Sequence, residues 1–166
     1  MSPHPIEIRP ATTDDWPQIR PIFEAVVAAG RSYAYPANLS DSDARELWLE
    51  ESPGQTVVAE VDGRIVGTAK MGPNRPARGS HVATASFMVD PQSQGQGVGR
   101  VLGEYAVAWA RDTGFLSMQF NAVVETNHAA VALWQSLGFQ TIGTVPEAFD
   151  HAQDGLVGLH VMFRYL

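Results

Sequence analysis

Blocks of apolar and polar residues follow one another along this chain in patterns that predict strands and helices in turn. Residues 6–9 (IEIR) alternate with the two-residue period of a half-buried strand. Residues 12–15 then offer helix-capping oxygens, and residues 16–27 repeat apolar side chains at helical spacing. A second short helix is predicted for residues 40–48. The first third of the chain therefore predicts one strand followed by two helices.

The middle of the chain is rich in β-branched residues. Residues 55–61 and 64–71 are two β-rich runs joined by Asp62-Gly63, a dipeptide typical of a type I′ hairpin. A third strand is predicted for residues 81–89, after a loop that contains prolines and glycines. The remaining predicted elements are a helix from Val98 to Gly114, a strand at 115–123, a helix at 127–137, and strands near 139–144 and 157–165.

The predicted order of elements, β-α-α-β-β-β-α-β-α-β-β, indicates a single α+β domain. Three consecutive strands that meander are followed by a β-α-β crossover, so the sheet is expected to be mixed rather than fully parallel. No repeat, low-complexity tract or linker divides the 166 residues. We therefore expect residues 1–166 to form one domain.

Composition excludes several classes of protein. The 11 Lys and Arg against 18 Asp and Glu give a net charge of −7, which disfavours a surface that follows a nucleic-acid backbone. The absence of cysteine excludes disulfides, thiolate metal sites and a cysteine nucleophile. The histidines lack metal-ligand spacing, so no metal is expected. No apolar run is long enough for a membrane span and no signal peptide is apparent, so a cytoplasmic location without membrane partners is predicted.

The segment Asp90–Arg100 joins a predicted strand to a predicted helix and carries glycines at 95, 97 and 99. Unpaired N–H groups at a helix N-terminus suit an anionic phosphate, and glycine allows that ligand to approach the backbone. The P-loop pattern fails because no Lys-Ser/Thr pair follows the glycines, and G-x-G-x-x-G fails because Arg100 or Leu102 falls at its third glycine. Both nucleotide-binding interpretations are therefore rejected.

What remains, Gln94-x-x-Gly97-x-Gly99 at the start of a helix, resembles the acyl-CoA loop of the GNAT superfamily of N-acyltransferases. A second element, residues 127–139 (NHAAVALWQSLGF), is similar to the family's Asn–Ala–aliphatic–aromatic–Gly-Phe helix. The resemblance implies a mixed, mostly antiparallel sheet of about seven strands and about four helices, splayed between the fourth and fifth strands. It also implies acetyl-CoA as co-substrate, and homodimers are common in the family.

The resemblance places the pyrophosphate on backbone N–H groups of residues 94–100 and the pantetheine arm in the splay of the sheet. It assigns the cofactor contacts to Phe87, Met88, Val89, Gln94, Gly95, Gln96, Gly97, Val98, Gly99, Arg100, Asn127 and Trp134. A backbone N–H near Met88 and Val89 is the expected oxyanion donor. Many relatives have a tyrosine acid where this chain has Trp134, and indole is no usable acid.

An alkylamine acceptor with a pKa near 10.4 must lose a proton at pH 7, which costs about 4.6 kcal/mol. A base or a desolvating pocket is therefore expected. Glu125, just past the strand 115–123, is the first candidate base, and Glu24 on the first helix is the second. Tyr33 and Tyr35, in the loop between the first two helices, are predicted to form a wall around a small acceptor. By the same resemblance, residues 146–155 are expected to face this cleft.

These features favour an N-acetyltransferase that moves an acetyl group from acetyl-CoA to a primary amine of a small molecule, by direct attack in a ternary complex. The acidic balance mildly favours a cationic acceptor such as a polyamine, an amino acid or a drug-like amine. One alternative is an enzyme acting on a protein N-terminus or lysine. The other is a catalytically silent acyl-CoA sensor. This alternative is supported by Trp134, which stands where many relatives have a tyrosine.

Overall fold

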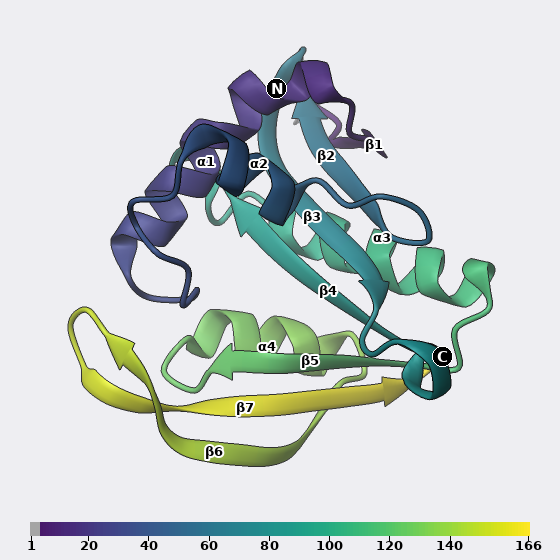
Figure 1. The fold of residues 1–166 in the computed structure, drawn as a ribbon, viewed down its shortest axis with the longest axis vertical. Coiled ribbons are helices and arrows are strands. Elements are labelled where there is room, and N and C mark those ends of the chain that lie inside the picture. Colours follow the sequence, from purple (N-terminus) through teal and green to yellow (C-terminus); the bar gives the residue numbers. More distant parts are fainter. Residues whose placement is uncertain (1–3) are drawn as a thin grey trace.

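The computed structural model describes residues 4–166, which form one seven-stranded sheet with helices on both faces (Figure 1). The elements are β1 (Glu7–Pro10), a 3-10 turn (Thr13–Asp15), α1 (Trp16–Ala29), α2 (Asp41–Trp48), β2 (Gln55–Val61), β3 (Arg64–Pro73), a 3-10 turn (Ala77–Gly79), β4 (Val82–Val89), a 3-10 turn (Pro91–Ser93), α3 (Val98–Thr113), β5 (Ser117–Val124), α4 (His128–Ser136), β6 (Gln140–His151) and β7 (Gly155–Tyr165). No helix in this range is long and apolar enough to cross a bilayer.

The strands lie in the order β1-β2-β3-β4-β5-β7-β6, and only β4 and β5 run parallel. The mixed, mostly antiparallel sheet with four α-helices is confirmed. The turn between β2 and β3 lies at Asp62 and Gly63, whose φ angles of 50° and 77° are the positive values that a type I′ turn requires.

Two apolar layers hold the helices against the sheet. α1 and α2 pack on one face through residues such as Phe23 and Trp48, and α3 and α4 pack on the other through residues such as Leu102 and Trp134. The strands contribute side chains to both layers because successive side chains of a strand point to opposite faces of the sheet. On β4, Met88 belongs to the layer with α1, whereas Phe87 and Val89 pack into the layer with α3.

β4 and β5 separate soon after they begin to pair. Their register has only two steps, Val82 with Ser117 and Ala83 with Met118, and the rest of β4 has no ladder partner on that side. Figure 1 shows the two strands converging near the C-terminus and diverging towards the loop between α1 and α2. β5 instead follows β7, with a register shift between Phe120 and Val123. The predicted splay between the fourth and fifth strands is confirmed.

The last part of the chain differs from the prediction. The sequence predicts a strand near 139–144, but β6 continues to His151. The ladder accommodates Pro146 because β6 is the edge strand and its register with β7 shifts between Val145 and Phe149. Glu147, with φ of 49°, lies within this bulge. The bulge turns the strand so that Phe149 is buried while most of β6 stays exposed.

Candidate active site

A cleft of about 450 Å³ opens where β4 and β5 separate. One end, here called the cofactor end, is lined by Gln94, Gly99, Asn127, Leu133 and Trp134, next to the start of α3 and along α4. The opposite end, here called the acceptor end, is lined by Val26, Tyr33, Tyr35, Val124, Phe149 and Leu159, from α1, the α1–α2 loop and β5–β7. The walls between the two ends come from residues 84–89 of β4 and residues 120–123 of β5.

The glycine-rich turn lies at the cofactor end. Gly95 and Gly97 have φ angles of 75° and 85°, and a Cβ at either position would meet no atom within 4 Å. Gly97 is the N-cap of α3, and no side chain caps that helix. The first N–H groups of α3 therefore face open space at a helix end that carries partial positive charge. Gly99 is constrained differently, since a Cβ there would lie 3.4 Å from Leu133 Cδ2.

Arg100 does not lie free beside the turn. Its guanidinium donates to Ser136 Oγ at 2.8 Å and stands 3.7 Å from the carboxylate of Glu104. These contacts direct the side chain towards α4. The partial positive charge at the start of α3 therefore comes from backbone N–H groups. The Arg100 guanidinium lies beside Ser136 and Glu104 instead.

The backbone of β4 alternates between the ladder with β3 and the cleft. The Asp90 N–H donates to the Val66 carbonyl at 2.9 Å, and Val66 and Asp90 extend the register that pairs Thr68 with Met88. In an antiparallel ladder, successive residues turn their N–H and C=O groups to opposite sides. The Met88 N–H therefore points to β3, and the Val89 N–H points to the gap between β4 and β5.

The Phe87 backbone also faces the gap, where Tyr33 occupies it. Tyr33 Oη donates to the Phe87 carbonyl at 2.7 Å and accepts from the Phe87 N–H at 2.7 Å. Tyr33 stacks on Tyr35 with ring centroids 5.3 Å apart and meets Trp48 edge-on. Burial raises the pKa of both phenols, so both stay neutral at physiological pH. The two tyrosines thus form an apolar, uncharged wall.

Trp134 belongs to both the core and the cleft. It is 7% exposed, and its ring lies 4.7 Å from that of Phe87 and 4.9 Å from that of Phe120. Asn127 caps α4, since its Oδ1 accepts from the Ala130 N–H at 3.2 Å. Within residues 4–166, one buried side-chain polar atom lacks a hydrogen-bond partner, and it is Thr126 Oγ1, next to Asn127.

Neither carboxylate predicted as a base lines the cleft. Glu125 Oε1 accepts a 2.6 Å hydrogen bond from the Gly158 N–H, so its side chain turns to β7. Glu24 is exposed on α1 and pairs with Arg20 at 2.6 Å. In the described range, residues 4–166, the cleft lining contains no Asp, Glu, His, Lys or Arg, and its titratable groups are Tyr33 and Tyr35.

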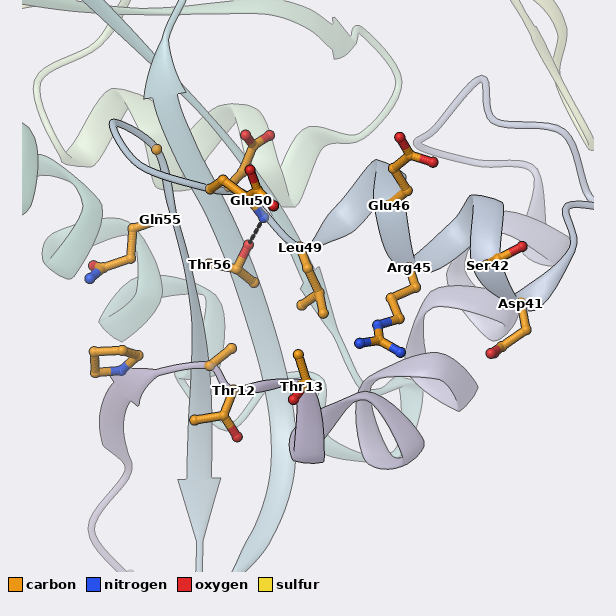
Figure 2. Close-up of a pocket in the computed structure, with 14 residues that line it drawn as sticks. Thr12, Thr13, Asp41, Ser42, Arg45, Glu46, Leu49, Glu50, Gln55 and Thr56 are labelled. Carbon is orange, nitrogen blue, oxygen red and sulfur yellow. Dashed lines mark hydrogen bonds between the residues drawn. The ribbon is translucent and has the colours of Figure 1, made fainter.

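A wider groove of about 840 Å³ lies elsewhere, between the start of α1, α2 and the start of β2 (Figure 2). Figure 2 shows side chains of α2, including Arg45 and Glu46, around this groove, and the Glu50 N–H bonded to Thr56 Oγ1 at 2.8 Å. None of the residues that resemble the acyl-CoA loop lines it. The larger hollow is therefore not the one on which the sequence motifs converge. Residues 4–166 contain no group of three or more metal-ligating side chains.

Sequence reasoning did not identify several residues of the cleft wall. Asn121 enters it because β5 shifts register with β7 at this point. Phe149 lies in the segment 146–155 that is expected to face the cleft, and it reaches the cleft because β6 extends past its predicted end. Ser86 and Leu159 reach it through pairings between distant strands. No local pattern in the sequence indicates Asn121, Ser86 or Leu159.

Comparisons with known proteins agree with this geometry. The model of the Acetyltransferase (GNAT) family matches residues 18–139, which include the glycine turn and α4. A structure of a GCN5-related N-acetyltransferase from Kribbella flavida is 54% identical, with a TM-score of 0.95 over 97% of this chain and 98% of that chain. The Salmonella typhimurium protein yncA, solved with its cofactor acetyl-CoA, is 25% identical, with a TM-score of 0.81 over 98% of this chain and 94% of that chain.

A sequence relative, the N-acetyltransferase aca1 of Schizosaccharomyces pombe, is 33% identical over 137 residues. These residues are 74% of this chain but 66% of that relative, so the chain spans just under two thirds of its length. The family model covers most of the chain and both motifs found in the sequence. On these grounds, the chain belongs to the acetyltransferase (GNAT) family.

Proposed function

We propose that this protein is an acetyl-CoA-dependent N-acetyltransferase, with residues 1–166 as its catalytic domain and a small-molecule primary amine as acceptor. One observation carries the proposal. The uncapped N-terminus of α3 opens onto the same cleft that β4 and β5 leave by separating. The start of α3, which suits a phosphate, and the gap between β4 and β5, which suits an extended ligand, therefore belong to one continuous cleft.

The residues at the cofactor end fit acetyl-CoA. The N–H groups of residues 95–100 and the open space at Gly95 and Gly97 suit a pyrophosphate. The Val89 backbone faces the gap and suits an amide of the pantetheine arm or the thioester oxygen. Asn127 uses its Oδ1 to cap α4, so we assign its NH₂ group to the pantetheine contact. Trp134 supplies a flat apolar surface along the arm.

Bound acetyl-CoA supplies the acetyl group as a thioester. The acceptor nitrogen forms the C–N bond as the C–S bond breaks, and the sulfur leaves with the bonding electron pair. We assign the Val89 N–H, which faces the gap, as the donor to the oxygen that gains charge in this step. With no cysteine in the chain, direct attack is favoured over a thioester-linked acyl-enzyme.

A small acceptor is favoured over a protein because the α1–α2 loop covers the acceptor end. Tyr33 is fixed to β4 by two hydrogen bonds and stacks on Tyr35, so this wall is ordered rather than open. An extended peptide would need that loop to move. The alternative acceptors, a protein N-terminus or lysine, and the catalytically silent sensor remain outcomes of the test.

The test is release of the CoA thiol from acetyl-CoA, followed with a thiol reagent in the presence of small primary amines or of peptides with free amino groups. We expect release with small amines and none with peptides. Release with peptides alone would favour the protein acetyltransferase. Acetyl-CoA binding without release from any acceptor would favour the sensor.

A further inference from the structure

The acceptor end of the cleft carries no formal charge at neutral pH. It is lined by the apolar residues Val26, Val124, Phe149 and Leu159 and by the neutral phenols Tyr33 and Tyr35. The polar side chains that line the cleft near this end carry hydroxyl groups, such as Ser32 in the α1–α2 loop and Ser86 on β4. A charged group placed in such a site loses its hydration and finds no counter-charge.

The charged groups on the surrounding elements, including Arg31 in the α1–α2 loop and Glu147 and Asp150 on β6, lie outside the lining of the acceptor end. The Glu50 carboxylate is near enough to Tyr35 to help burial raise the pKa of that phenol. Several of the other groups are held by partners. Glu24 on α1 pairs with Arg20, Glu50 beyond α2 stands 3.4 Å from Lys70, and Glu125 after β5 accepts from Gly158. The two histidines of the β6–β7 pair are also engaged. His151 Nδ1 accepts from the Gln153 and Asp154 N–H groups, and His160 Nδ1 lies 2.7 Å from Thr144 Oγ1.

We propose, building on the acetyltransferase function above, that the acceptor is a primary amine on an uncharged apolar or aromatic group, and that the cleft admits it un-ionised without a carboxylate base. A polyamine would bring a second ammonium into this uncharged chamber, and an amino acid would bring a carboxylate. Neither charge has a partner among the lining residues, so both are disfavoured. The cationic acceptor that the acidic composition suggested is therefore disfavoured by the cleft itself.

The same environment removes the need for a side-chain base. An ammonium entering an apolar site is disfavoured relative to the neutral amine, so its proton stays in bulk solvent when the amine enters. The neutral nitrogen then attacks, the C–N bond forms, and the C–S bond breaks. After the attack, the nitrogen carries one proton more than the amide product. This proton passes to the departing thiolate, which leaves as the thiol. No protein group changes its protonation state in this sequence.

The first test uses two matched pairs of acceptors with the full chain and acetyl-CoA. 2-Phenylethylamine differs from phenylalanine by a carboxylate, and pentylamine differs from 1,5-diaminopentane by a second ammonium. We expect kcat/KM for CoA release to be about 10- to 100-fold higher for the member of each pair that lacks the additional charged group, 2-phenylethylamine and pentylamine. Equal or reversed values would overturn this inference and leave the acetyltransferase function intact. No release with any of the four, despite acetyl-CoA binding, would count against both.

The second test follows kcat/KM against pH for aralkylamines of graded pKa. If the cleft selects the neutral amine, the rising limb of each profile shifts with the pKa of that amine. The matched variant is Glu125→Gln, whose amide oxygen can still accept from the Gly158 N–H. We expect the rising limb of its pH profile to stay at the same pH as in the wild type. A limb fixed at one pH for all amines and lost in Glu125→Gln would identify a carboxylate base and overturn the inference.

Discussion

One oxygen atom, Tyr33 Oη, satisfies both backbone groups of Phe87, donating to its carbonyl and accepting from its N–H at 2.7 Å each. A phenol has one hydrogen and free lone pairs, so it can do both at once. These are the groups that a neighbouring strand would use if β5 had stayed beside β4. Tyr33 thus closes part of the edge that the splay leaves open and ties the α1–α2 loop to the cleft.

Replacing this phenol with Phe should leave the Phe87 N–H and carbonyl without partners. We expect Tyr33→Phe to lower the free energy of unfolding by about 1–3 kcal/mol, measured by urea denaturation. We also expect a higher KM for the amine, because the loop is no longer fixed. Tyr165→Phe, at a residue 79% exposed, is the matched control and should cost nothing. A Tyr33→Phe protein as stable as the control would mean that these hydrogen bonds contribute little.

The Val89 N–H can be removed without disturbing the ladder, because it faces the cleft rather than β3. Val89→Pro removes the proposed oxyanion donor, whereas Val89→Ala keeps it. Loss of one such donor lowers kcat by about 100- to 1000-fold. We therefore expect that loss in the proline variant alone, with circular dichroism unchanged. Similar kcat values for the two variants would place the donor elsewhere.

Trp134 fills the space between α4 and the sheet. Its ring contacts those of Phe87 and Phe120, and a Cβ on Gly103 would lie 2.8 Å from it. Trp134→Ala leaves a large cavity and should cost about 3–5 kcal/mol, whereas Trp134→Phe should cost about half as much. Chemical denaturation gives both values. A small cost for the alanine variant would show that the side chain is dispensable for packing.

The buried carboxylate of Asp15 should make stability depend on pH. It accepts two 2.8 Å hydrogen bonds from Arg9 and one from the Thr12 N–H, and these lower its pKa below the ordinary value. A pKa lowered on folding contributes stability above the unfolded value near 4, and the contribution is lost as the pH falls through the folded value. Asp15→Asn should therefore cost about 2 kcal/mol at pH 7 and less below pH 4.

The control for this pH effect is Asp112→Asn, since Asp112 is exposed on α3. Thermal melts of the three proteins between pH 3 and pH 7 give the comparison. The Asp15→Asn difference from wild type should shrink on acidification, and the Asp112→Asn difference should be near zero throughout. A constant Asp15→Asn difference would mean that the carboxylate charge does not contribute.

Local signals in the sequence predicted the elements that depend on neighbouring residues. Asp62-Gly63 specified its hairpin turn, and the glycines at 95 and 97 specified an open helix N-terminus. The order of elements and the family resemblance together predicted the sheet and its splay. Non-local geometry was less accessible. The turn of Glu125 towards Gly158 depends on how β7 pairs with β5, and the extension of β6 depends on a bulge at an edge. No short-range pattern encodes either.

The uncharged cleft was also beyond the reach of composition. A net charge of −7 describes the whole surface, whereas the acceptor end is made of a few side chains from four separate parts of the chain. Only the three-dimensional arrangement of those parts shows that no acidic residue among residues 4–166 lines the acceptor end.

The central claim is that the glycine turn at α3 binds the anionic part of acetyl-CoA. The most direct measurement is calorimetric titration of acetyl-CoA into wild type, Gly97→Asp and Gly63→Asp. Both glycines have positive φ and open space around them, so the backbone cost of the two substitutions is similar, about 1 kcal/mol. Only Gly97→Asp places a carboxylate at the helix N-terminus. We predict equal affinity for wild type and Gly63→Asp, and binding at least about 30-fold weaker for Gly97→Asp. No binding to wild type, or equal affinities for the two variants, would contradict the account.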